Sequence, residues 1–198
     1  MKSQKNLFNS LIIGISTACY IVFFYSCNIN SNQQEKNLEQ HDYTVAAYVW
    51  PSCHDEPMSR EALWGEGTGE WEIIKKAYPL FEGHYQPRIP LWGYQMDDDP
   101  KAWEKKIKAA TDNGLNTFIF DWYWYDGKPF LEEALNEGFL GAGNNKDMKF
   151  YIMWANHGAN GKQWNRLKFE KDTILWPGTV DWDNYKIVVS RVIKQYFQ

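Results

Sequence analysis

Residues 99–124 decide the fold, and they read DPKAWEKKIKAATDNGLNTFIFDWYW. The first half predicts a helix, because Asp99 is a typical N-cap, Pro100 is a typical first-turn residue, and the apolar side chains that follow recur at helical spacing. Gly114 stands where such a helix ends. The apolar and aromatic run of residues 115–124 then predicts a buried strand. A capped helix that leads directly into a buried strand indicates an α/β fold.

The rest of the chain continues this alternation. Residues 45–50 (VAAYVW) predict a first strand buried on both faces, and residues 149–154 (KFYIMW) predict a third strand. Residues 129–140 have an apolar stripe at helical spacing, and a last helix is predicted to open at Asp183. Residues 51–98 between the first strand and the first helix have no sustained periodicity, which predicts a long irregular loop with at most short helices.

Alternating strands and helices imply a parallel sheet with right-handed crossovers. A (β/α)8 barrel needs eight such units and about 250 residues, whereas three units are recognisable here. The sequence therefore predicts the first three βα units of a (β/α)8 TIM-type barrel, incomplete at the C-terminus. The competing fold, a small doubly wound sheet, usually has a glycine-rich phosphate turn after its first strand, and none follows Trp50. An unpaired edge at the third strand predicts that such a piece folds poorly alone.

The N-terminal part predicts export rather than fold. Residues 1–27 combine two lysines with an apolar run too short for a typical membrane span, as in a secretory signal peptide. The run ends at Cys27, which resembles the acylated cysteine of a bacterial lipoprotein signal; Cys19 competes with it, and an incidental cysteine after a simple cleaved signal is the alternative. The polar residues 28–42 predict a flexible tether, so that the domain comprises residues 43–198. The expected location is the cell envelope, lipid-anchored to the outer membrane.

Composition narrows the possible partners. Removal of residues 1–27 takes away two lysines and no acid, so the net charge falls from −4 to −6, which argues against nucleic-acid binding. Cys53 is the one cysteine in residues 43–198, so no disulfide framework is available within that domain. The four histidines lack zinc-site spacing, so we expect neither a metal nor a cofactor. The 11 Trp, 12 Tyr and 11 Phe exceed what a small core requires, and many of these rings are expected to line a cleft.

Each predicted strand ends in aromatic and polar residues, and barrel active sites lie at these carboxyl ends. Sugars require this combination, because rings pack on their C–H faces while carboxylates, amides and imidazoles bind their hydroxyls. For Asp121 two roles remain open, a ligand of sugar hydroxyls and a structural aspartate bonded to the backbone or to Arg88. The candidate sugar contacts at the strand ends are Tyr48, Trp50, Asp121, Tyr123, Trp124, Asp126, Trp154, Asn156 and His157.

The long loop carries the most specific motif, WGEGTGEWEIIKKAYPLFEGHYQPRIPLWGYQMDDDP over residues 64–100. It resembles the WbsX-type, glycoside hydrolase family 99-like group, and the resemblance covers most of residues 43–165. The matching positions are Trp64, Gly65, Gly67, Glu70, Trp71, Ala77, Pro79, Phe81, Gly83, His84, Gln86, Pro87, Arg88, Pro90, Gly93, Tyr94, Asp99 and Pro100. The chain departs from the group's common Trp-Ala-Asn-Glu at the third strand, where it has His157 in place of the glutamate.

The resemblance implies a (β/α)8 barrel that acts on carbohydrate, by glycan hydrolysis or in polysaccharide assembly. It places the catalytic pair on later strands, so no catalytic residue is assigned in this chain. Within the motif the expected sugar contacts or supports of the barrel mouth are Glu70, Trp71, His84, Gln86 and Arg88, for which purely structural roles are the alternative. The leading prediction is a carbohydrate-active envelope protein with glycoside hydrolase character. The alternatives are a non-catalytic glycan-binding lipoprotein, a glycosyltransferase-like protein of surface-polysaccharide assembly, and an inactive truncated product.

Overall fold

A computed structural model describes residues 43–65 and 67–197 of the chain. The predicted signal peptide (residues 1–27), the tether (residues 28–42) and the acylated Cys27 lie outside the described residues. Within the described part, no helix combines the length and the hydropathy needed to cross a membrane. The fold below concerns the unit formed by residues 44–198.

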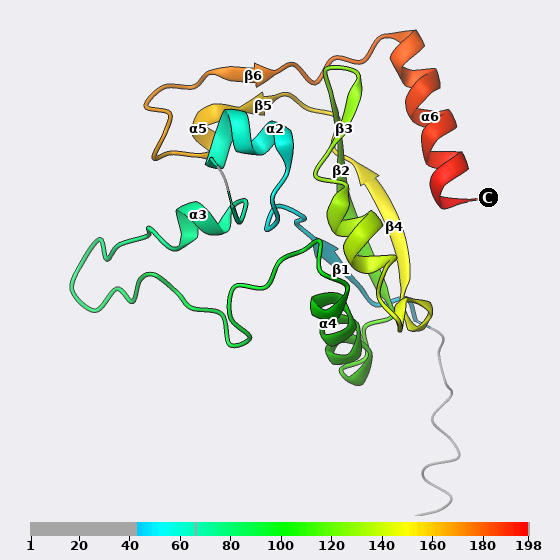
Figure 1. The fold of residues 1–198 in the computed structure, drawn as a ribbon, viewed down its shortest axis with the longest axis horizontal. Coiled ribbons are helices and arrows are strands. Elements are labelled where there is room, and N and C mark those ends of the chain that lie inside the picture. The colour runs from blue at the N-terminus through cyan, green and yellow to red at the C-terminus, as the bar shows by residue number, and fades with distance from the viewer. Residues whose placement is uncertain (1–42, 66, 198) are drawn as a thin grey trace, which may run out of the picture. The chain divides into compact units, whose positions relative to one another are not determined.

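Strand β2 (Thr117–Tyr125) is the centre of the sheet, and β1 (Ala46–Val49) and β4 (Lys149–Trp154) pair with it in parallel on its two sides (Figure 1). The register aligns Tyr48 with Ile119 and Ile119 with Tyr151. The three parallel strands thus lie in the order β1, β2, β4, which is their order in the chain. The predicted α/β class, the parallel sheet and its three strands are confirmed, but the described strands do not close into a barrel.

The segment after β2 differs from the prediction. Strand β3 (Lys128–Phe130) turns back antiparallel to the end of β2, and Asp126 and Gly127 in the turn have φ values of 49° and 75°. Positive φ at both central residues is the requirement of the two-residue hairpin turn for which Asp-Gly is preferred. The prediction of a helix from Pro129 was therefore wrong at its start, and the helical part is η3 (Ala134–Phe139), a π-helix.

The two long helices confirm the capping signals. In α4 (Pro100–Asp112), the side chain of Asp99 accepts a hydrogen bond from the Lys101 amide at 2.9 Å, as expected for an N-cap. Helix α6 (Trp182–Tyr196) begins one residue before the predicted Asp183, because Asp181 accepts the capping hydrogen bond, from the Asn184 amide at 2.7 Å.

One face of the sheet is covered by helices. Trp103 of α4 packs on Phe118 and Phe120 of β2 and on Phe139 of η3, with ring centroids 5.2 to 5.8 Å apart. Farther along the same face, residues of β2 pack with Val188 of α6. Because these side chains alternate along β2, their neighbours in sequence point to the opposite face.

Over β1 and β4, the opposite face of the sheet is exposed among the described residues, whereas Tyr123 and Tyr125 at the end of β2 are buried on that side. Tyr48 of β1 is 71% exposed and Tyr151 of β4 is 55% exposed, although both are aromatic residues of strands. The prediction that the first strand is buried on both faces was therefore wrong. No layer of described residues covers this side of β1.

Short elements occupy the loops. The long loop contains α2 (Pro57–Ser59), η2 (Arg60–Trp64) and α3 (Trp71–Ile74), as expected for irregular structure with short helices. Four further elements were not predicted: the 3-10 turn η4 (Asn145–Asp147), the helix α5 (Gly161–Trp164), and the antiparallel pair β5 (Ala159–Asn160) and β6 (Ile174–Trp176). A second hydrophobic cluster joins these loops to the end of β2. Its buried members are Met58, Leu63, Trp64, Tyr123, Tyr125, Phe130, Leu131, Ala159, Trp164 and Trp176.

Candidate functional site

Glu70 lies in the long loop, and hydrogen bonds hold it next to the residues that follow β1. Its Oε2 accepts hydrogen bonds from Trp50 Nε1 at 2.5 Å and from the Ser52 hydroxyl, and its backbone amide donates to the Ser52 carbonyl at 3.0 Å. These bonds fix the carboxylate beside the Trp50 ring. Oε1 accepts no hydrogen bond from the described residues and stays available for a ligand.

A close backbone approach makes this attachment possible. Gly69 has a φ of 60°, and a Cβ at this position would lie 2.3 Å from the carbonyl oxygens of both His54 and Ser52. A left-handed φ together with so little space requires glycine. The sequence of the loop thus places Glu70 where a bulkier preceding residue would not allow it.

Asp121 is the second carboxylate, and it lies on β2 directly after the residues that pair with β1. It accepts a hydrogen bond from the Tyr123 hydroxyl at 3.3 Å through Oδ2, while Oδ1 is buried without a partner among the described residues. Burial raises the pKa of the Asp121 carboxyl above its ordinary value, and the Tyr123 bond and the nearby His157 oppose this only in part. Burial, with the charge of Asp121 next, also raises the pKa of the Tyr123 hydroxyl, which therefore remains a hydrogen-bond donor at neutral pH.

Aromatic rings join the two carboxylates into one site. Trp50 contacts the edge of Tyr123 with ring centroids 5.9 Å apart, and Trp164 of α5 packs against both, at 5.2 Å and 5.6 Å. The His157 ring also meets Tyr123 edge-on at 5.9 Å. We call this group the strand-end cluster; it consists of Trp50, Glu70, Asp121, Tyr123, His157 and Trp164.

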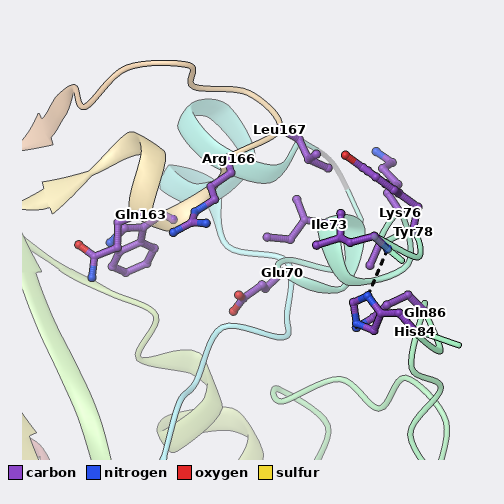
Figure 2. A pocket seen from close by; sticks show the side chains of 12 residues that line it. Glu70, Ile73, Lys76, Tyr78, His84, Gln86, Gln163, Arg166 and Leu167 are labelled. Carbon is purple, nitrogen blue, oxygen red and sulfur yellow. Dashed lines mark hydrogen bonds between the residues drawn. The ribbon is translucent and has the colours of Figure 1, made fainter. Parts of the chain in front are cut away.

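A pocket of about 410 Å³ adjoins the cluster and shares Glu70 and Trp164 with it. Figure 2 shows its lining, with His84 and Gln86 on one side and Arg166 on another. This volume lies within the range of small-molecule sites, which typically occupy about 300–1,000 Å³. The pocket therefore adds a hollow of small-molecule size beside the cluster.

Several residues predicted from the motif support the loop. Trp71 Nε1 donates to the Gln95 carbonyl at 2.7 Å, and His84 Nδ1 accepts from the Leu80 amide at 3.2 Å. Gln86 Oε1 accepts from the Arg88 amide at 3.2 Å. The Arg88 side chain is exposed and, among the described residues, bonds no carboxylate, so the predicted alternative of an Arg88 partner for Asp121 is not found.

Other predicted residues lie away from the cluster. Trp124 and Trp154 are on the helix-covered face, where Trp124 stacks on Trp122 at 5.9 Å and Trp154 stacks on Tyr185 at 6.3 Å. The remaining three are exposed elsewhere: Tyr48 on the open face of the sheet, Asp126 in the hairpin turn, and Asn156 in the loop before His157.

Sequence reasoning missed two members of the site environment. Ser52 had a signal, because it follows the first strand as His157 follows the third. Trp164 had none, because its place depends on the fold of residues 155–180. Burial raises the pKa of the Cys53 thiol to about 12, so that the thiol is protonated at neutral pH. Within residues 43–65 and 67–197, no group of three metal-binding side chains is close enough to hold an ion.

The raised pKa of Asp121 predicts a pH-dependent stability. The folded state binds the proton more tightly than the unfolded state, so wild-type stability falls as pH rises from the ordinary aspartate value of 3.8 through the raised folded pKa. In the Asp121→Asn variant this pH-dependent loss of stability is absent, because the amide does not titrate, and the amide oxygen can still accept the hydrogen bond from Tyr123. Urea unfolding between about pH 4 and about pH 7 should show the variant gaining stability relative to wild type. The turn variant Asp126→Asn is the control, and an equal pH dependence in both variants would contradict the prediction.

The site and the fold together define a class of protein. A parallel α/β sheet whose carboxyl edge gathers carboxylates, tryptophan rings and an adjoining pocket has the features of a protein with a carbohydrate-related function. A family model described as Glycosyltransferase WbsX matches residues 45–198, and the chain belongs to this WbsX family. The predicted resemblance to WbsX-type domains is thereby confirmed.

Two curated relatives match part of the chain. Both are described as uncharacterized protein WxcX, from Xanthomonas campestris pv. campestris strains B100 and ATCC 33913, and each is 33% identical over 114 residues. The alignment covers 57% of this chain but 16% of each relative, so the chain spans a small part of their length. No solved structure matches the chain.

Proposed function

We propose that this chain binds an oligo- or polysaccharide at the strand-end cluster, as the front of a (β/α)8 barrel that acts on glycosidic linkages. The observation that carries the proposal is the junction of Glu70 and Asp121 through the Trp50–Tyr123 contact, beside an open pocket. Membership of the WbsX family supports the carbohydrate class.

The two carboxylates suit hydroxyl recognition. Each has one oxygen held by the protein and one without a partner among the described residues, namely Glu70 Oε1 and Asp121 Oδ1. A sugar hydroxyl can donate to Glu70 Oε1 and to Asp121 Oδ2, which accepts one bond from Tyr123 and has a second acceptor site, whereas the buried Asp121 Oδ1 is out of a ligand's reach. The half-exposed Trp50 ring offers an apolar face for the C–H side of the same unit. We therefore assign both residues to substrate contacts rather than to proton transfer.

Hydrolysis is the preferred reaction of the intact barrel. It usually requires two carboxyl groups that face each other across the bond, and in this proposal they come from strands other than the three described. The family description favours a second candidate, transfer of a sugar from an activated donor. Product formation that depends on a nucleotide sugar would select transfer, and product formation in water with the glycan alone would select hydrolysis.

The binding proposal can be tested on the full chain. Glycan-array screening followed by calorimetry should find a glycan whose affinity falls about tenfold or more in Glu70→Gln and in Asp121→Asn, since a charged hydrogen bond contributes about 1.5–3 kcal/mol. The matched controls are Glu137→Gln and Asp126→Asn, which change the same groups at exposed positions. If no glycan binds, or if all four variants behave alike, the proposal is wrong.

A further inference from the structure

The pocket beside the strand-end cluster has a charge pattern that the proposed function does not use. Its polar lining includes two cations, Lys76 and Arg166, in addition to Glu70. Arg166 also lines an adjoining pocket of about 380 Å³, together with Lys162 and Asp172. The cations come from separate parts of the chain, the loop after α3 and the loop after α5.

Neither cation is neutralised within the part of the chain that the structure describes. Six of the 18 described lysines and arginines have a carboxylate within 4.0 Å, and Lys76 and Arg166 are among the twelve that do not. Glu70 lines the same pocket but is bonded elsewhere, because Trp50 and Ser52 hold its Oε2. Figure 2 shows Glu70 and Arg166 as separate side chains with no hydrogen bond between them.

An unpaired guanidinium in a pocket selects for anions. Its planar fork matches the two oxygens of a carboxylate or a phosphate, and such bidentate bonds are among the strongest polar contacts in proteins. Gln163, next to Arg166 in the lining, adds an uncharged amide that can bind hydroxyls of the same unit.

We infer that the pocket beside Glu70 binds an acidic sugar unit, with Arg166 as its main anion contact and Lys76 as a second one. The inference rests on the proposed function, because the neutral part of the glycan occupies the strand-end cluster. The anion is a carboxylate, as in a uronic acid, or a phosphate carried by the sugar. The chain thus discriminates acidic glycans from neutral glycans of the same shape.

Calorimetry on the full chain with galacturonic acid trimer, its methyl ester and galactose 6-phosphate tests the inference. The ester keeps the shape and removes the charge, and the phosphate distinguishes the two sources of anion. We expect an acidic probe to bind more tightly than the ester, and Arg166→Gln to weaken that probe about tenfold while leaving the ester unchanged. Arg166→Lys should restore only part of the affinity, since an ammonium lacks the fork.

The matched control is Lys146→Gln, which removes an exposed cation from η4, outside the residues that line the pocket. Equal affinity for the acidic trimer and its ester would overturn the acidic-sugar inference while the proposed function stands. If Arg166→Gln lowers the affinity for the acidic trimer and for its ester equally, the inference is also wrong. Arg166 would then support the fold of the pocket and would not bind the charge of the sugar. Failure of every glycan, neutral and acidic, would remove both proposals together.

Discussion

Replacement of Trp103 by alanine is expected to lower the free energy of unfolding by about 3–5 kcal/mol, the usual cost of emptying a buried aromatic site. The side chain is 1% exposed and contacts Phe118, Phe120 and Phe139, so one substitution removes the contacts between α4, β2 and η3. It also leaves the Asp97 carbonyl without the indole hydrogen bond, which is 2.6 Å long.

Chemical denaturation followed by circular dichroism measures this effect without relying on tryptophan fluorescence. Trp103→Phe keeps one aromatic ring and removes the donor, so its smaller loss combines the hydrogen bond, worth about 1 kcal/mol, with the cost of the reduced ring volume. Trp182→Ala is the control, because that ring is 69% exposed on α6 and should cost little. A loss below about 1 kcal/mol in Trp103→Ala would contradict the packing of α4 on β2 and η3.

The position of Trp103 could be predicted because its signals are local. A cap at Asp99, a first-turn proline and an apolar stripe specify α4 from residues close in sequence, and an apolar run specifies β2 in the same way. The hairpin after β2 had an equally local signal, Asp126-Gly127 between aromatic runs, but the apolar spacing of residues 129–140 favoured a helix instead. The π-helix at the end of that segment has no sequence rule that would have identified it.

The candidate site was predictable only in part. Trp50, Asp121 and His157 were predicted from the strand ends, and each of them contacts Tyr123 in the structure, because parallel strands bring their carboxyl ends together. The alternation of side chains along β2 places Trp124 on the face opposite to Asp121 and Tyr123, and this separation could be predicted from the sequence. The approach of Trp164 could not be inferred, because it depends on long-range packing across about a hundred residues to Trp64, at a centroid distance of 6.0 Å.

Glu70 could be predicted only in part from the sequence. The motif indicated that the residue matters, but the pairing of its amide and carboxylate with Ser52 is a tertiary contact that no local rule predicts. The sequence does contain one local sign of that contact, Gly69, whose lack of a side chain permits the close approach. A glycine adjacent to a candidate ligand can therefore be read as evidence that the backbone passes close to another segment.

Replacement of Gly69 by alanine is expected to lower the free energy of unfolding by about 2–5 kcal/mol and to abolish glycan binding. The added Cβ would lie 2.3 Å from the carbonyl oxygens of Ser52 and His54, and neither backbone group can move as a flexible side chain would. The backbone around Gly69 must therefore move away from Ser52 and His54. Glu70 then loses its hydrogen bonds to Ser52 and its position beside Trp50.

Gly114→Ala is the control that separates the steric clash at Gly69 from the strain of a positive φ. Gly114 has a φ of 83°, and a Cβ added there would meet no described atom within 4 Å, so its substitution should cost only the left-handed strain of about 1–2 kcal/mol. Denaturation curves and glycan calorimetry on both variants should show a larger loss of stability in Gly69→Ala and a loss of binding in that variant alone. If both variants have the same stability and both retain binding, the position of Glu70 does not depend on the close approach at Gly69. Some other contact would then hold Glu70 in the strand-end cluster.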